Sequence, residues 1–190
     1  MVRKRELYSS AIRSRLMIRD ALLELMSEKN FESISVSEIM KRADLVRRTF
    51  YAHYKTKEDI ITQYIDSLIN DSLDHVLNGV IKCNGSMALV YFRLWNDHKD
   101  FITLLKDNNQ LVLLNNFHKY INYVHEQSNV FINMGLSSGA SKYAAKFYAG
   151  AMWSVLSQWI ETGMEETPEE LSDLLYELFG VSQEYGCNNS

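Results

Sequence analysis

The stretch from Ser35 to Lys57 constrains this chain most, because its residues predict two short helices joined by a tight turn. Ser35 and Glu38 have the spacing of a capping box, in which each side chain satisfies a free backbone N–H group at a helix start. Asp44 falls where the turn needs a residue that tolerates left-handed dihedral angles, as Asp does better than most. In the second helix, Phe50 lies on the predicted buried side. The pattern is typical of a helix-turn-helix.

The second of these helices has a surface rich in cationic and hydrogen-bonding side chains. In a helix-turn-helix, this helix lies in the major groove of DNA, where residues near its N-terminus reach base edges. Arg47 and Arg48 open the helix. Because an arginine fork matches the O6 and N7 acceptors of guanine, we expect at least one of them to read a base. Lys57 opens the next helix behind a predicted Thr56 cap, and a cation beside free N–H groups favours a phosphate.

A longer pattern supports this interpretation. Residues 10–65 resemble the DNA-binding region of the TetR family of bacterial transcriptional regulators, through the run SVSEIM-KRADLV-RRTFYAHYKTKED with Phe31 before it. The two arginines before Thr-Phe-Tyr are also similar to a subgroup that includes dihydroxyacetone-kinase-operon regulators. The family usually has Gly where Asp44 stands and Ser where Val46 stands. Since Val46 cannot cap a helix, we expect Asp44 or water to cap this one.

The resemblance implies roles for further residues. Family members grip the DNA backbone at the positions of Thr49, Tyr51, His53 and Lys57, so these residues should mainly hold phosphates. It also implies a ligand-released repressor that binds a palindromic operator as a homodimer. The full set predicted to contact double-stranded DNA is Ser35, Ser37, Arg47, Arg48, Thr49, Tyr51, His53, Lys55 and Lys57.

Composition favours helices over strands throughout. The 190 residues include one Pro and eight Gly, the two residue types that most often interrupt helices. We expect an all-α fold, with an N-terminal three-helix helix-turn-helix domain and a C-terminal helical bundle that forms a dimer. The predicted divisions are a DNA-binding domain at 1–57, a linking helix at 57–79, a ligand-binding and dimerisation domain at 80–182, and a flexible tail at 183–190.

Apolar periodicity and loop residues predict the helix bounds. The first helix should begin at Ser9 or Ser10, after a disordered basic arm, and should end near Glu28. Thr167 and Pro168 form a strong helix start, with Thr as the cap and Pro at the first helical position. Other helices are expected at 87–97, 99–107, 110–133 and 140–162.

Charge is distributed unevenly along the chain. Residues 1–57 contain 13 Lys and Arg against 7 Asp and Glu, whereas residues 58–190 contain 7 against 17. A basic first third on an acidic remainder is what phosphate binding at one end requires.

Aromatic residues gather in the second half of the chain. Thirteen of the 22 lie between Tyr91 and Trp159. One interpretation is an aromatic-lined cavity for a small, mostly apolar or aromatic ligand. The other is that these rings fill a helical core. The candidate pocket residues are Tyr91, Trp95, Phe117, Tyr120, Tyr148 and Met152.

The last two predicted helices have the pattern of an interface. Small residues recur on one face of the long helix, which allows another helix to approach closely. Two such helices from each of two chains would form a four-helix seam, although a core within one chain could produce the same pattern. The candidate dimer residues are Ala144, Phe147, Ala151, Ser154, Leu171, Leu174 and Leu178.

Other classes of function have little support. His118 and His125 lie seven residues apart without an evident third metal ligand, and Cys83 and Cys187 have no metal or redox spacing, so we expect no enzyme and no cofactor. No apolar run predicts a signal peptide or membrane span, which favours a cytoplasmic protein, associated with the nucleoid when bound to DNA. The alternative function is a helical protein–protein adaptor with a vestigial helix-turn-helix.

Overall fold

The computed structural model describes residues 2–77, 87–117 and 137–179. Within these ranges the regular structure consists of α-helices and two 3₁₀ helices, with no strand, so the predicted all-α class is confirmed. The chain divides into two compact units. The first contains Met1–Ser67 and Leu104–Leu113, and the second contains Leu68–Thr103 and Leu114–Ser190.

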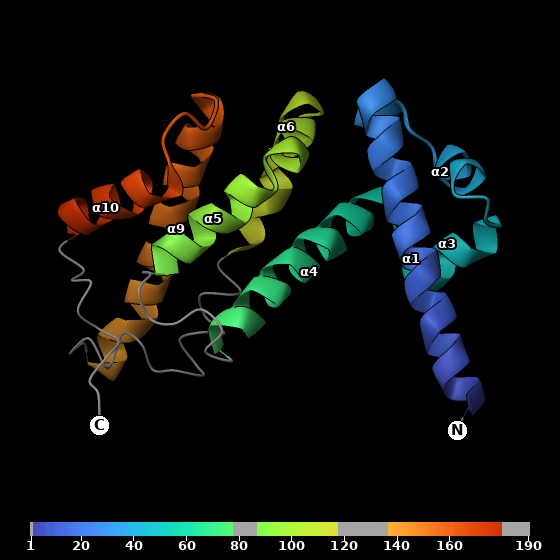
Figure 1. The fold of residues 1–190 in the computed structure, drawn as a ribbon, viewed down its shortest axis with the longest axis horizontal. Helices are drawn as coiled ribbons and strands as arrows, with labels where there is room; N and C mark the ends of the chain where they lie inside the picture. Colours follow the sequence, from blue (N-terminus) through green and yellow to red (C-terminus); the bar gives the residue numbers. More distant parts are fainter. Residues whose placement is uncertain (1, 78–86, 118–136, 180–190) are drawn as a thin grey trace. The chain divides into compact units, whose positions relative to one another are not determined.

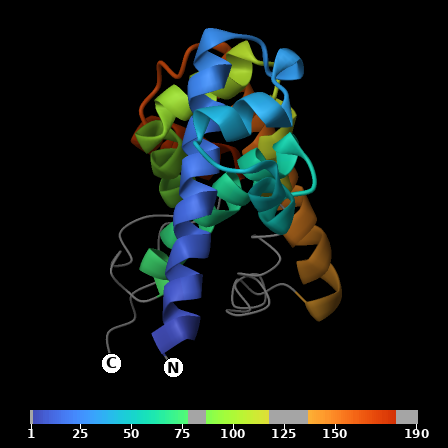
Figure 2. The same cartoon turned by 90° about the vertical axis from the view of Figure 1, so that its right-hand side faces the viewer.

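Helices α1, α2 and α3 lie in the first unit and contact one another (Figures 1 and 2). Helix α1 begins at Val2, so the prediction of a disordered arm before Ser9 is wrong. The basic run at its start contains no Pro or Gly, and Arg, Lys and Glu favour helix, which explains the extension. The elements are α1 (Val2–Glu28), the 3₁₀ helix η1 (Phe31–Ser33), α2 (Val36–Arg42), α3 (Arg47–His53) and the first part of α4 (Lys57–Leu77).

A small apolar core holds these helices together. Phe31 and Phe50 are fully buried, and burying such a side chain contributes about 1.5–3 kcal/mol. Phe50 was predicted to lie on the buried side of its helix, and this is confirmed. The residues of this core that are 5% exposed or less include Leu25, Phe31, Ile34, Ile39 and Phe50.

In the second unit, helices α5 and α10 contact each other. Arg93 of α5 and Glu169 of α10 add an exposed ion pair, with 2.7 Å between Nη2 and Oε1. Helix α10 begins with the predicted Thr167 cap, whose Oγ1 accepts from Glu170 N at 3.2 Å. The remaining elements are α5 (Met87–Asp97), α6 (Lys99–Asp107), the 3₁₀ helix η2 (Leu111–Phe117), α9 (Ser138–Glu161) and α10 (Pro168–Phe179).

The predicted bounds agree with most of these helices. Helices α5 and α6 span the predicted ranges, and α9 lies within two residues of its prediction. The helix predicted at 110–133 is different, because its described part forms the 3₁₀ helix η2 and its remainder lies outside the described residues. Helices α4 and α6 each cross the boundary between the two units.

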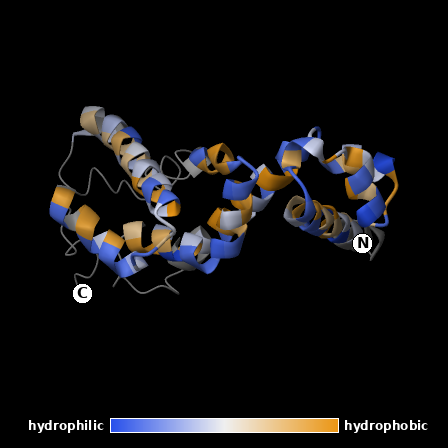
Figure 3. Ribbon diagram, turned by 90° about the horizontal axis from the view of Figure 1, so that it is seen from above, coloured by the Kyte–Doolittle hydropathy of each residue, from blue (hydrophilic) through white to orange (hydrophobic). Residues whose placement is uncertain are grey.

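Figure 3 shows apolar and polar residues interspersed along the helices of both units. In α6 and α10 the buried residues, such as Leu105 and Leu171, lie on the side that faces a core. None of the described helices is both long enough and apolar enough to cross a bilayer.

Candidate nucleic-acid interface

The turn between α2 and α3 has the geometry that the sequence predicts. Ser35 and Glu38 form the capping box at the start of α2. Asp44 has a left-handed φ of 52°. The backbone N–H of Leu45 donates to the carbonyl of Met40 at 3.0 Å, and that of Asp44 donates to Lys41. These two bonds make a Schellman motif, which ends α2 sharply and redirects the chain into α3.

Helix α3 begins without a side-chain cap. Val46 occupies the N-cap position with an extended backbone, and no side chain accepts from the first turn of the helix. The expected cap from Asp44 is therefore absent. Val46 is 71% exposed, so the N-terminal end of α3 faces solvent.

The exposed face of α3 presents its two arginines. Arg47 and Arg48 are both exposed. The Nη2 of Arg47 donates to the Tyr51 hydroxyl at 3.1 Å, and the Arg47 guanidinium carbon lies 5.7 Å from the centroid of that ring. Tyr51 is 55% exposed, so this pair holds a guanidinium fork at the surface.

The remaining predicted DNA contacts surround α3. Thr49 and His53 are half-buried on the same helix, and Lys55 is exposed just after it. Burial lowers the pKa of His53, and the charge of nearby Arg15 lowers it further. Its neutral imidazole is therefore favoured. At the start of α2, the N-cap Ser35 and the helical residue Ser37 are both exposed.

Lys57 is engaged within the first unit. Its ammonium donates to the carbonyls of Phe31 at 2.6 Å, Ile34 at 3.1 Å and Glu32 at 3.3 Å. It also lies 4.3 Å from the centroid of the Phe31 ring. An ammonium has three N–H donors, so a phosphate contact would replace one of these bonds. The predicted phosphate role of Lys57 stays a prediction.

The start of α4 is capped as the sequence predicts. The carboxylate of Asp59 accepts from the backbone N–H groups of Lys55 at 2.8 Å and Thr56 at 2.9 Å. The bond from Thr56 is the main cause of the lowered pKa of Asp59. This cap fixes the short connection between α3 and α4.

Three ion pairs connect α2 with α1 and the residue that follows it, one of them between Arg42 and Glu24 at 3.3 Å. Arg42 makes a bidentate contact with Glu28, at 2.9 and 2.8 Å. Lys29, just after α1, binds Glu38 of the capping box, and this bond is the main cause that lowers the pKa of Glu38 to about 2. These cations support the fold, whereas Arg47 and Arg48 remain available at the surface.

Sequence reasoning missed one polar residue of this unit. Asn108 follows α6 between two predicted helices, where a polar residue suggests an exposed loop, yet it is 4% exposed. Its amide forms hydrogen bonds with the backbone of Met26 in α1 and of Phe31 in η1. An asparagine is common in loops, so no local pattern indicates that this one is buried.

The predicted pocket residues lie in or beside the core of the second unit. Tyr91, Trp95 and Met152 are buried and Tyr148 is half-buried. The Tyr91 and Trp95 rings pack edge to face, with centroids 6.2 Å apart. Burial raises the pKa of Tyr148 to about 12. Tyr120 and the side chain of Phe117 lie outside the described part of the chain.

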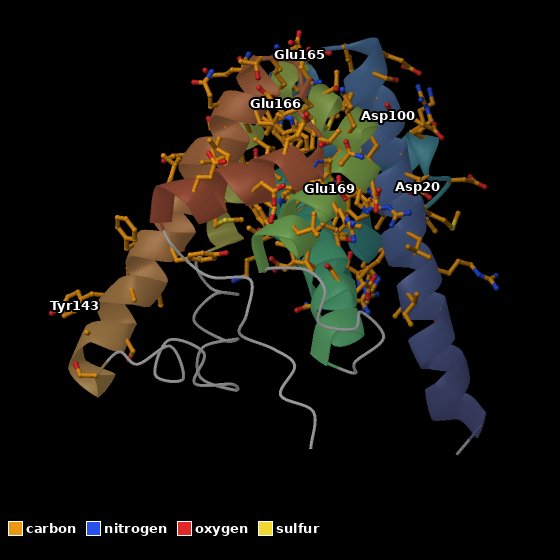
Figure 4. All side chains as sticks on the ribbon, turned by 60° about the vertical axis from the view of Figure 1, so that its left-hand side comes forward. Asp20, Asp100, Tyr143, Glu165, Glu166 and Glu169 are labelled. Carbon is orange, nitrogen blue, oxygen red and sulfur yellow. The ribbon has the colours of Figure 1, made fainter. Side chains whose placement is uncertain are left out.

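The predicted dimer residues divide into exposed and buried groups. Phe147, Leu174 and Leu178 are 65%, 44% and 62% exposed. Leu171 is only 4% exposed, which places it in the core of its own chain. Tyr143, which sequence reasoning missed, is 67% exposed and projects from α9 (Figure 4). On the same helix, Ser154 is exposed, and Ala144 and Ala151 are half-buried.

Comparisons with known proteins agree with this geometry. Residues 86–180 match the family described as the transcriptional regulator C-terminal region, and residues 18–64 match bacterial regulatory proteins of the tetR family. YxbF of Bacillus subtilis, described as an uncharacterized HTH-type transcriptional regulator, is 27% identical over 179 residues, or 88% of this chain and 45% of YxbF. DhaS of Lactococcus lactis, described as a dhaKLM operon transcriptional activator, is 33% identical over 63 residues, or 31% of this chain and 34% of DhaS.

This chain spans less than half the length of either of these relatives. The two family matches nevertheless cover both of its parts, from the helix-turn-helix to the end of α10. The chain therefore belongs to the TetR family of bacterial transcriptional regulators.

Proposed function

We propose that the protein is a sequence-specific DNA-binding transcriptional regulator, in which α3 enters the major groove. The observation that carries this proposal is the pair Arg47 and Arg48 at the exposed start of α3, with the Arg47 fork held by Tyr51. A fork held before binding loses less rotamer entropy when it pairs with a base.

The phosphate contacts in this proposal flank the base-reading arginines. Lys55 is exposed at the end of α3, and Thr49, Tyr51 and His53 lie on the helix itself. Ser35 and Ser37 would add contacts from the start of α2. We assign Lys57 a supporting role, because its ammonium already bonds three carbonyls of the segment between α1 and α2.

The proposed active form is a homodimer on a palindromic operator. Tyr143 and Phe147 of α9 and Leu174 and Leu178 of α10 support it, because large apolar side chains this exposed suit burial against a second copy. A two-fold dimer presents two copies of α3, which match two half-sites about one helical turn apart.

The proposed regulation is release from DNA by a small, mostly apolar or aromatic ligand. Tyr91, Trp95 and Met152 are the candidate contacts, and helices α4 and α6 run continuously from the second unit into the first. This mode corresponds to a repressor. An activator is the second candidate, because the relative DhaS is described as one.

Selection of bound fragments from a genomic library tests the DNA-binding proposal. The full chain should enrich fragments that share a two-fold symmetric sequence, and Arg47→Ala with Arg48→Ala should abolish that enrichment. Lys146→Ala, which removes an exposed cation of α9, is the matched control and should leave the sequence unchanged. No enrichment by the wild-type chain would overturn the proposal and favour the adaptor function.

A further inference from the structure

Asn108 is a buried amide whose hydrogen bonds join three segments of the first unit. Its Oδ1 accepts from the backbone N–H of Phe31 at 2.8 Å. Its Nδ2 donates to the carbonyl of Met26 in α1 at 3.1 Å and to that of Leu104 in α6 at 3.0 Å. The side chain thus satisfies one donor and two acceptors of the main chain at a site with 4% exposure.

The local backbone fixes the direction of this side chain. Asn109 has a left-handed φ of 58°. The N–H of Gln110 donates to the carbonyl of Leu105 at 2.8 Å and that of Asn109 to Lys106 at 3.0 Å, which is the Schellman pattern. Gln110 is itself 8% exposed, and its Nε2 lies 3.4 Å from the carboxylate of Glu32. Residues of the α6 end therefore contact η1 at two points.

The contacts that Asn108 and Gln110 make with α1 and η1 are called the Asn108 joint below. Phe31 connects this joint with the start of α4. Its N–H is held by Asn108 and its carbonyl is held by Lys57, at 2.8 and 2.6 Å. Lys57 is the first residue of α4, and the short α3–α4 connection precedes it. A set of hydrogen bonds thus connects the end of α6, through Phe31, to the start of α4, which follows the recognition helix in the chain.

We infer that Asn108 is a positioning residue for DNA binding, because it holds Phe31, and through Lys57 the start of α4, in the arrangement that presents α3. This inference rests on the proposed function. Asn108 lies far from the recognition helix in sequence, and its segment, Leu104–Leu113, belongs to the same compact unit. The DNA-binding unit therefore includes a piece of the chain from beyond the helix-turn-helix.

Asn108→Asp tests this role by replacing one heavy atom, the amide nitrogen, with oxygen. The acceptor for Phe31 remains, but the second oxygen replaces the donor that faces the carbonyls of Met26 and Leu104. An ionised carboxylate is unfavourable there, whereas a protonated one can donate to one of the two carbonyls, so burial and the carbonyls should raise its pKa. The hydrogen bonds of the joint should therefore be favoured as the pH falls.

Affinity is measured on the DNA duplex enriched by the wild-type chain, as the ratio of variant to wild type from pH 8 to pH 5.5. Asn108→Asp should bind about tenfold more weakly than wild type at pH 8 and should regain part of that affinity at pH 5.5, where the protonated carboxyl restores one of the two donor bonds. Asn109→Asp adds the same charge at an exposed neighbour, so its ratio should stay flat. The charged groups that adjoin the joint are Glu32 of η1, Lys57 of α4 and Lys106 and Asp107 of α6. Their titration affects the affinity of both proteins, so it cancels in the ratio of variant to wild-type affinity.

Circular dichroism at each pH shows whether the variant is folded, and only folded samples are compared. If Asn108→Asp does not fold, the hydrogen-exchange rate of the Phe31 backbone amide in the wild-type protein provides the test. The joint requires this amide to exchange as slowly as the amides of α1. Unprotected exchange at Phe31, or a folded variant with wild-type affinity at pH 8, overturns the inference. Failure of the wild-type chain to enrich any duplex overturns the proposed function instead.

Discussion

Lys57 and Phe31 contact each other through two different groups: the ammonium donates to the Phe31 carbonyl at 2.6 Å and lies 4.3 Å from the ring centroid. The cation therefore satisfies backbone acceptors at η1 and lies beside a fully buried ring. A lysine at a helix start is unfavourable for the helix dipole. These contacts explain the lysine at this position without requiring DNA.

Replacing Lys57 distinguishes its two possible roles. Lys57→Ala removes the ammonium donor from three carbonyls, of which that of Phe31 still accepts from the Ile34 N–H. Chemical denaturation should therefore show a loss of roughly 1–3 kcal/mol in the free energy of unfolding. DNA binding should weaken equally on all sequences while the salt dependence of binding stays that of the wild type. A salt slope lowered by about one counterion would instead assign Lys57 to a phosphate.

Single arginine variants should separate base reading from phosphate binding. Either Arg47→Ala or Arg48→Ala should relax the preference at one symmetric pair of operator positions by about 1–3 kcal/mol. Tyr51→Phe removes only the hydroxyl that holds Arg47, so it should lower affinity without changing the preferred base. Selection with each variant provides the measurement. If both arginine variants keep the wild-type preference, both residues contact phosphates.

The exposed face of α9 should form the dimer. Phe147→Arg places a charge where the proposed partner copy packs, and an unpaired buried charge is costly. Sedimentation should then show monomers, and DNA binding should weaken sharply because two half-sites are no longer engaged together. Glu165→Arg introduces the same residue in the exposed loop before α10 and should leave the dimer intact. If the Phe147→Arg variant remains dimeric, the dimer interface does not include this face of α9.

Local sequence signals predict the helix-turn-helix closely. The capping boxes at Ser35 and Thr56 and the left-handed Asp44 depend on residues close to one another in the chain, so they can be found without knowing the tertiary structure. The same holds for the bounds of α5 and α6, which follow periodicity and loop residues.

Contacts between distant residues are the part that sequence could not predict. Asn108 and Phe31 are 77 residues apart, and Asn108 has no feature that separates it from an exposed loop amide. Lys57 has the residue type of a phosphate ligand, yet tertiary packing directs its ammonium to three carbonyls. Leu171 shares the apolar pattern of Leu174 and Leu178, and only the fold shows that it belongs to the core.

Acid should weaken the first unit through Glu38. Its pKa is lowered to about 2, first by Lys29 and then by Ser35, so its ionised form stabilises the fold at neutral pH. That stabilisation is present above the unfolded pKa of about 4.3 and is lost as the pH falls toward 2. Urea unfolding of Glu38→Gln should show lower stability at pH 7 and a smaller loss between pH 5 and pH 2. Glu165→Gln serves as the control, and equal pH dependence in both would contradict the assignment.

Asp44 should lower stability through its strained backbone and lower DNA affinity through its negative charge. Two substitutions separate these effects. Its φ of 52° is unfavourable for a side chain with a Cβ, and its carboxylate lies three residues before Arg47. Asn tolerates the left-handed region as Asp does, so Asp44→Asn should leave stability nearly unchanged and should tighten DNA binding by removing a negative charge. Asp44→Gly removes the same charge and also the Cβ.

Thermal unfolding and DNA titration of both variants provide the measurement. Asp44→Gly should unfold at a higher temperature than Asp44→Asn, by an amount set by about 1 kcal/mol of left-handed strain less the entropy that Gly adds to the unfolded chain. The two variants should bind DNA equally, since they carry the same charge. A gain in affinity confined to Asp44→Gly would show that the backbone at the turn, rather than the carboxylate, limits how α3 meets DNA.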